Sequence, residues 1–81
     1  MTIHVKLFSL ARERAGHESV EVTLPEGADV AQLRLALVKA CLPLGPVLPS
    51  CRVAIDQAYV EDDATVHASS EVPILPPVSG G

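Results

Sequence analysis

The amino-acid sequence predicts a small α+β fold, in which one main helix packs across one face of a mixed sheet. Three observations predict it. Residues 3–7 and 20–24 alternate between apolar and polar side chains, which is typical of strands with one buried face. In residues 30–41 the apolar positions recur at helical spacing. Short apolar stretches at 53–60 and 72–75 are bounded by turn residues, and they supply the remaining strands.

Composition limits the classes of protein that the chain can represent. Its 81 residues suffice for one domain, and 48% of them are hydrophobic, so a core without metal or disulfide support is expected. The formal charge of −4, with six scattered lysines and arginines, argues against nucleic acid and favours a partner with a basic face. The sequence has neither a long apolar run nor a signal-peptide pattern. We therefore expect a cytoplasmic protein without a membrane partner.

The first part of the chain should form a hairpin. A strand is expected over residues 3–7. Residues 10–15 are good helix formers, and Gly16 suits the position just past a short helical turn. A second strand is expected over residues 20–24. The two strands should pair antiparallel across this turn.

One main helix is expected next. Asp29 fits the N-cap, and Gln32, three residues later, completes a capping-box pattern. The helix should cover residues 30–41. The following stretch, 43–49, holds three prolines and one glycine and is expected to be irregular, with Val47 and Leu48 filling a gap beneath it.

The last third should supply the remaining strands. Residues 53–55 and 59–60 are expected to be strands joined by a turn, and residues 61–64 a solvated connection. Ser69 and Ser70 mark a turn ahead of the last strand. Pro73 lies inside that strand and cannot donate a hydrogen bond to a ladder, so an edge-facing or bulged position is expected there.

A single long helix between the second and third strands is the β-grasp, or ubiquitin-like, arrangement. We expect a β-grasp domain over residues 1–75 and a flexible tail over residues 76–81, which consists of Pro76, Pro77, Val78, Ser79, Gly80 and Gly81. The prolines favour an extended path and the glycines can enter a narrow channel. Extended, the tail could reach roughly 20 Å. The sequence therefore predicts delivery of the Gly81 carboxylate into another protein's active site.

Other groups that could carry chemistry are few. His4, His17 and His67 have no partner at metal-ligand spacing, so no metal site is expected. Cys41 and Cys51 match neither a zinc site nor a redox pair, and we expect two buried or half-buried thiols. A phosphate-binding glycine loop is missing as well. We therefore expect no enzyme activity and no bound cofactor.

The chain contains two aromatic residues, Phe8 and Tyr59. Phe8 falls on the polar phase of the first strand, and Leu75 is out of phase with the apolar residues before it. We expect Phe8, Tyr59 and Leu75 to form a docking patch on the outer face of the sheet, near the tail. The alternative is that Phe8 packs under the short helix.

The terminal carboxylate needs help to react. An α-carboxyl group is ionised at neutral pH and is a poor electrophile. It must first become an activated acyl group, and this chain has no nucleotide site of its own. An ATP-using partner is therefore expected.

Three segments resemble one known family: residues 5–8 (Val-Lys-Leu-Phe), residues 11–16 (Ala-Arg-Glu-Arg-Ala-Gly) and the ending from Glu71 to Gly81. They are similar to the small subunit of molybdopterin synthase, a MoaD-type sulfur carrier with a ubiquitin-like β-grasp fold. The likeness runs from end to end of the chain, and the Pro-Pro-Val-Ser-Gly-Gly ending is its most specific part.

The resemblance implies a function for Gly81. A MoeB-like enzyme would use ATP to adenylate its carboxylate, and a sulfur donor such as a cysteine desulfurase or a rhodanese would supply the sulfur of a thiocarboxylate. The tail would then enter a MoaE-type large subunit, where sulfur passes to the pterin precursor of the molybdenum cofactor. Phe8, Tyr59 and Leu75 would contact these partners.

Two other functions remain open at this point. The chain could be a ubiquitin-like modifier that forms isopeptide bonds through Gly81, because such modifiers also use one activated carboxylate. It could also be a ThiS-like sulfur carrier for thiazole synthesis in the thiamine pathway. Chain length and the Arg12-Glu13 segment favour the molybdopterin version.

Overall fold

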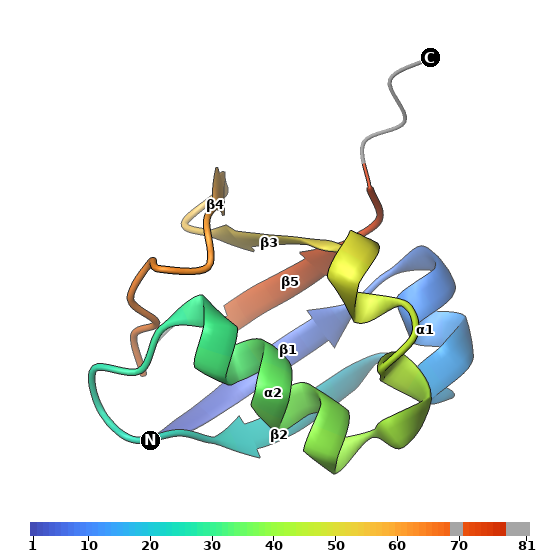
Figure 1. The fold of residues 1–81 in the computed structure, drawn as a ribbon, viewed down its shortest axis with the longest axis horizontal. Coiled ribbons are helices and arrows are strands. Elements are labelled where there is room, and N and C mark those ends of the chain that lie inside the picture. Colours follow the sequence, from blue (N-terminus) through green and yellow to red (C-terminus); the bar gives the residue numbers. More distant parts are fainter. Residues whose placement is uncertain (69–70, 78–81) are drawn as a thin grey trace.

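The computed structural model describes residues 1–68 and 71–77, and Figure 1 shows how they are arranged. Their elements, in chain order, are β1 (Thr2–Leu7), α1 (Ser9–Ala15), β2 (Ser19–Thr23), α2 (Val30–Ala40), the 3₁₀ turns η1 (Leu42–Leu44) and η2 (Leu48–Ser50), β3 (Arg52–Ile55), β4 (Ala58–Val60) and β5 (Glu71–Leu75). The predicted order of strands and helices is confirmed.

The strands in the described part of the chain form one five-stranded sheet in the order β2-β1-β5-β3-β4. β1 and β5 run parallel, whereas the β1–β2, β3–β5 and β3–β4 pairs are antiparallel. α2 crosses one face of this sheet (Figure 1). The predicted α+β class and β-grasp arrangement are therefore confirmed.

The N-terminal hairpin forms as predicted. β1 and β2 pair from Thr2↔Thr23 to Lys6↔Ser19. Gly16 ends α1 with a φ of 75°, a left-handed conformation that glycine adopts at little cost. The tight end of α1 lets the chain return directly alongside β1.

A capping box begins α2, as the sequence predicts. The N–H of Gln32 donates to Oδ1 of Asp29 (2.9 Å), and the N–H of Asp29 donates to Oε1 of Gln32 (3.1 Å). These bonds satisfy donors that the first helical turn would otherwise leave unpaired. The helix ends at Ala40, one residue earlier than predicted, and Cys41 is its C-cap.

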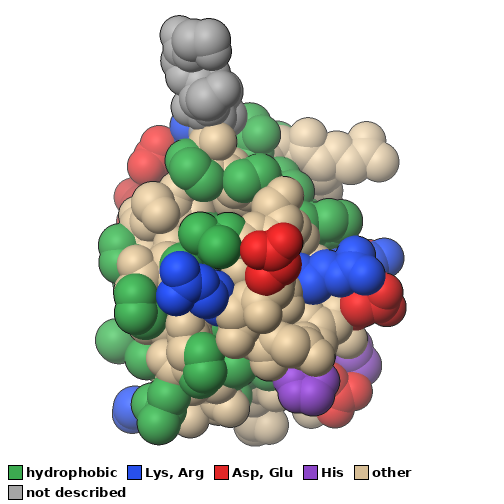
Figure 2. Space-filling view, turned by 90° about the vertical axis from the view of Figure 1, so that its right-hand side faces the viewer, with side chains coloured by type: hydrophobic (Ala, Val, Ile, Leu, Met, Phe, Trp, Pro, Cys, Tyr) green, Lys and Arg blue, Asp and Glu red, His purple; other side chains and the backbone are tan. Residues whose placement is uncertain are grey.

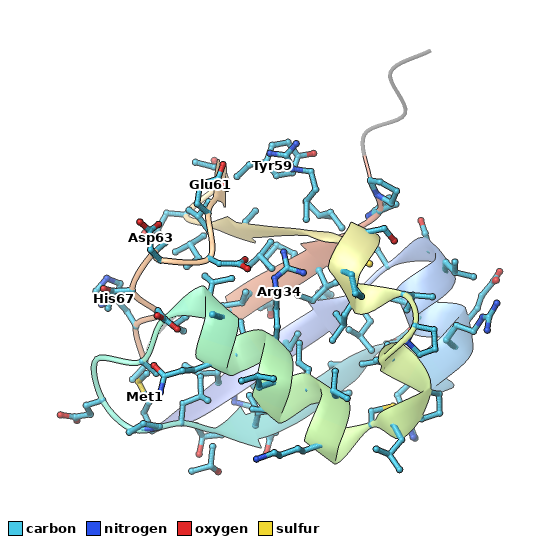
Figure 3. All side chains as sticks on the ribbon, viewed as in Figure 1. Met1, Arg34, Tyr59, Glu61, Asp63 and His67 are labelled. Carbon is cyan, nitrogen blue, oxygen red and sulfur yellow. The ribbon has the colours of Figure 1, made fainter. Side chains whose placement is uncertain are left out.

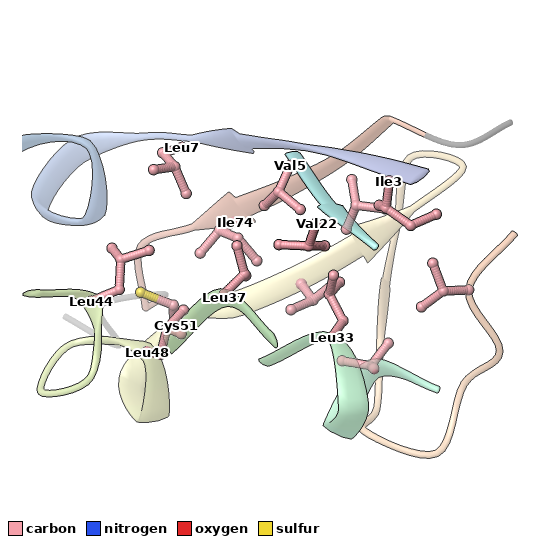
Figure 4. Close-up of a cluster of buried hydrophobic side chains, with 14 of the residues drawn as sticks. Ile3, Val5, Leu7, Val22, Leu33, Leu37, Leu44, Leu48, Cys51 and Ile74 are labelled. Atoms are coloured by element: carbon pink, nitrogen blue, oxygen red, sulfur yellow. The ribbon is translucent and has the colours of Figure 1, made fainter. Parts of the chain in front are cut away.

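The core lies between the sheet and α2, as Figure 4 shows. The buried faces of β1 and β5 meet Leu33 and Leu37 of α2 there. Val47 and Leu48 are buried, so the predicted filling of the gap under the proline-rich stretch is confirmed. Leu44 and Val66 also belong to this core, although neither lies in a strand or helix that the sequence pattern predicts.

The expected edge-facing or bulged position of Pro73 is wrong, because the register of β5 with β1 is continuous through Lys6↔Pro73 and contains no bulge. β5 lies in the middle of the sheet, with β1 on one side and β3 on the other. The proline is compatible with this place because the β3–β5 ladder contains only the pairs Arg52↔Leu75 and Val53↔Ile74. Pro73 comes one residue before Ile74 and lies just outside this ladder. Its missing N–H therefore removes no hydrogen bond to a paired β3 residue.

Arg34 ties α2 to two loops, and sequence patterning did not reveal it. Its guanidinium donates to the carbonyl oxygens of Leu48 (2.7 Å) and Cys51 (3.0 Å). Its Nε donates to Oδ1 of Asp62 (3.0 Å), so the predicted solvated connection is anchored to the helix. Figure 3 shows Arg34 reaching from α2 toward the segment that precedes β3.

Candidate functional site

The tail follows the central strand of the sheet. β5 ends at Leu75, and both Pro76 and Pro77 are exposed. The other predicted tail residues, Val78, Ser79, Gly80 and Gly81, lie outside the described residues. The role of the Gly81 carboxylate therefore remains a prediction.

Two of the three residues predicted to form a docking patch lie together on the outer face of the sheet, opposite α2. Tyr59 and Leu75 line one shallow hollow together with Ala54, Gln57 and Pro73. Tyr59 is 50% exposed, and Figure 3 shows it beyond β3, on the side away from α2. These two predicted patch residues therefore share one surface.

Phe8, the third predicted patch residue, lies next to Leu75 on the same face of the sheet. Its backbone is extended (φ −130°, ψ 156°), and it follows the last pair of the parallel ladder, Leu7↔Ile74. Continuing that register by one residue places Phe8 beside Leu75, on the exposed phase of β1. Phe8 is 37% exposed, so it is not completely buried under α1. Its role as a partner contact remains a prediction.

Arg52 belongs to the same surface, although sequence reasoning did not propose it. It pairs with Leu75 across the β3–β5 ladder. Its guanidinium lies over the Tyr59 ring, 4.4 Å from the ring centre. The alternation of β3 places Arg52 on the polar phase, but nothing local in the sequence reveals its aromatic neighbour.

Other groups in the described part of the chain do not assemble into a chemical site. His4, His17 and His67 are all exposed, and His4 pairs with Glu21 (3.2 Å). Within residues 1–68 and 71–77, no three His, Cys, Asp or Glu side chains lie close enough to hold a metal ion. The same residues contain no helix that is long and apolar enough to span a bilayer.

The thiols match their prediction. Cys41 is half-buried and Cys51 is buried, and neither forms a disulfide. Burial raises the pKa of the Cys51 thiol, and the positive charge of Arg34 offsets part of this rise. A raised pKa disfavours the reactive thiolate, so Cys51 is suited to packing rather than to catalysis.

Charge is mixed on the end of the molecule formed by α1. Figure 2 shows acidic and basic side chains next to one another across this face, with hydrophobic side chains between them. One ion pair of this region joins Arg12 and Glu18 (3.1 Å). This face therefore has no single-sign patch of the kind that binds nucleic acid.

The sheet order, the crossing of α2 and the tail that follows the central strand define a ubiquitin-like β-grasp protein. Comparisons with known proteins then place the chain more closely. Residues 5–81 match the ThiS family, and the chain belongs to that family.

Three similar proteins illustrate the relationship. The molybdopterin synthase sulfur carrier subunit of Chlamydomonas reinhardtii is 35% identical over 83 residues, which cover 100% of both chains. The crystal structure of SAMP1 from Haloferax volcanii superposes with a TM-score of 0.86 at 28% identity, again over 100% of both chains. A chain from the complex of subunits 1 and 2 of the molybdopterin-converting factor of Helicobacter pylori superposes with a TM-score of 0.69 over 100% of both chains. Its identity is 22%, so this likeness shows the fold alone.

Proposed function

We propose that the chain is the sulfur carrier subunit of a molybdopterin synthase, with the carboxylate of Gly81 as the carrier group. One observation carries the proposal. The likeness to a sulfur carrier subunit extends over the whole chain at 35% identity, and the family match runs through the terminal glycine. The exposure of Pro76 and Pro77, directly after the central strand, supports the delivery of this group to a partner.

Activation follows from the chemistry of a carboxylate. Because the ionised group is a poor electrophile, its oxygen attacks the α-phosphorus of ATP on a MoeB-like enzyme, and pyrophosphate leaves. The terminal sulfur of a persulfide, supplied by a cysteine desulfurase or a rhodanese, then displaces AMP from the glycyl adenylate and forms an acyl disulfide. A second thiol cleaves the S–S bond of this intermediate and is itself oxidised to a disulfide with the sulfur donor. The product is a terminal thiocarboxylate. ATP is bound by the partner in this scheme, and the chain itself acts as a non-catalytic carrier.

Transfer requires a second partner. The tail, from Pro76 to Gly80, carries the thiocarboxylate into the active site of a MoaE-type large subunit, where sulfur passes to the pterin precursor. Phe8, Tyr59 and Leu75 lie on the sheet face beside the start of the tail, where a protein that takes in the tail would make contact.

Two alternatives have specific support. The crystal structure of Haloferax volcanii small archaeal modifier protein 1 is 25% identical in sequence to this chain. A modifier would use Gly81 to form isopeptide bonds with lysines. The family match is to the ThiS family, which keeps a carrier for thiazole synthesis as a further candidate. Both alternatives use the same activated carboxylate, so only the product distinguishes them.

Intact-mass spectrometry of the protein from its native cells tests the proposal. The expected result is a mass increase equal to the exchange of one oxygen for one sulfur atom. Deletion of Gly81 should abolish this increase, whereas a matched Ser79→Ala variant, which keeps both terminal glycines, should retain it. Sulfur loading by the truncated chain would contradict the proposal. High-mass lysine adducts would favour the modifier, and co-purification with a thiazole synthase would favour the ThiS-like carrier.

A further inference from the structure

The basic side chains on the outer face of the sheet have different neighbours. Nζ of Lys6 lies 4.0 Å from a carboxylate oxygen of Glu71. Nδ1 of His4 lies 3.2 Å from a carboxylate oxygen of Glu21. Arg52 is on the same face. Within the described residues, no carboxylate lies at ion-pairing distance from its guanidinium. It lies instead over the Tyr59 ring. Arg52 therefore presents a positive charge that this part of the chain does not neutralise.

The stacking also orients the guanidinium. An arginine that lies over an aromatic ring uses the face of its planar group, and the N–H donors at its edge remain available. That edge matches the two oxygens of a carboxylate, which can accept two parallel hydrogen bonds. The ring holds the guanidinium in place before any partner arrives, so less side-chain entropy is lost when a carboxylate binds.

The position of Arg52 links it to the tail. It pairs directly with Leu75, the last residue of β5, and Pro76 follows next in the chain. Tyr59 and Leu75 line the shallow hollow beside it. A protein that takes in the tail must approach the place where the tail leaves the sheet. It would then cover the apolar hollow and the guanidinium together.

We propose that Arg52 is a partner-recognition residue: the protein that receives the tail places a carboxylate against its guanidinium and an apolar surface over Tyr59 and Leu75. The partner in question is the large subunit, so this inference rests on the proposed function. The proposal predicts that the partner's contact surface is apolar and carries one acidic group. That acidic group would complement Arg52, although the formal charge of the whole chain is −4. Enclosure by the apolar contacts strengthens such a pair, because it removes the competing water.

Calorimetry at two salt concentrations measures the Kd between the chain and the large subunit of the same organism. The Kd of the wild-type chain is the reference for the variants. Arg52→Ala should raise the Kd about 30-fold, and Arg52→Glu about 100-fold or more, because the partner's carboxylate is left unpaired or opposed. Arg52→Lys should lie between Arg52→Ala and the wild type, since lysine keeps the charge but loses the two-bond geometry. The Kd of Arg52→Ala should also depend less on salt than that of the wild type.

Two controls separate local recognition from general effects. Lys39→Glu makes the same change in net charge as Arg52→Glu, but it lies in the last turn of α2. It should change the Kd less than about threefold, because screened charges outside the contact have little effect. For the stacking ring, Tyr59→Phe keeps the aromatic face and Tyr59→Leu removes it. Tyr59→Leu should therefore weaken binding more than Tyr59→Phe does. Thermal unfolding of each variant verifies that the fold is retained.

The outcomes distinguish this inference from the proposed function. If the wild-type chain carries sulfur and binds the large subunit, but Arg52→Ala and Arg52→Glu bind equally well, then the inference is wrong and the proposed function survives. Equal losses for Lys39→Glu and Arg52→Glu would also overturn it, because long-range charge would then suffice as the explanation. A wild-type chain that neither carries sulfur nor binds the large subunit overturns both.

Discussion

Removal of the Arg34 side chain should destabilise the fold more than removal of any exposed cation. Its guanidinium joins α2 to the carbonyl oxygens of Leu48 and Cys51, and its side chain is only 21% exposed. In Arg34→Ala these two acceptors lose a charged donor in a partly buried setting. The third bond, to Asp62, matters less because the Asp62 side chain is 61% exposed.

The magnitude follows from these exposures. Hydrogen bonds from charged donors contribute about 1.5–3 kcal/mol when buried, and partial exposure lowers this to about 1–1.5 kcal/mol for each carbonyl bond. The exposed pair with Asp62 adds less than about 1 kcal/mol. The free energy of unfolding should therefore fall by about 3 kcal/mol. For a domain of this size, each kcal/mol corresponds to about 4–8 °C in Tm, so the Tm should fall by roughly 12–24 °C.

Urea unfolding and calorimetry measure this change. Arg14→Ala is the matched control, because Arg14 is exposed near the end of α1, and its loss should change the free energy of unfolding by less than about 0.5 kcal/mol. Asp62→Ala isolates the exposed pair and should cost less than about 1 kcal/mol. If Arg34→Ala is as stable as Arg14→Ala, the bonds to the two carbonyls do not stabilise the fold, and this reasoning fails.

Three further predictions follow from individual residues. Asp29→Ala removes the α2 cap and should cost about 1 kcal/mol in a thermal melt, whereas Asp29→Asn keeps the cap and should cost less; equal losses would contradict the capping argument. Burial raises the pKa of Cys51 above the ordinary 9.0, so the folded state holds this proton more tightly than the unfolded chain does. The resulting stability is complete below pH 9 and is lost as the pH rises through the folded pKa. Urea titrations from pH 8 upward should therefore show a steeper fall for the wild type than for Cys51→Ala, and parallel curves would exclude the effect. Phe8→Asp should weaken binding to the large subunit with little change in Tm, because it places a charge in an apolar contact. Leu42→Asp is its control, since Leu42 is 74% exposed and lies in η1, beyond the end of α2; equal binding by both variants would remove Phe8 from the interface.

Local sequence signals predicted the parts of the fold that depend on local physics. The period-two alternation of β1 and β2 fixes which side chains are buried, and the structure buries Ile3, Val5 and Leu7 as expected. The pattern of Asp29 and Gln32 predicts the start of α2, because capping involves atoms only three residues apart. Gly16 likewise ends α1 where the sequence indicates.

Features that depend on contacts between distant segments could not be predicted in this way. The strand order places β5 in the centre of the sheet, so the edge position expected for Pro73 was wrong. Arg34 reaches residues 14, 17 and 28 positions away, and nothing in its own helix indicates those partners. The stacking of Arg52 on Tyr59 also depends on the pairing of β3 with β4, which the local pattern leaves open.

The central place of β5 has a consequence for the carrier function. A tail that followed an edge strand would start from a segment paired on one side only, and such segments open more easily. Here β5 pairs with β1 and with β3, and Ile74, just before its last residue, is fully buried. The start of the tail is therefore held by a strand that is paired on both sides. Because that start is fixed, the distance that Gly81 can reach is set by the six tail residues alone, roughly 20 Å when extended. The docked face and the partner's active site must lie within that distance of each other, which is why the contacts around Leu75 and the chemistry at Gly81 are expected to act on the same partner.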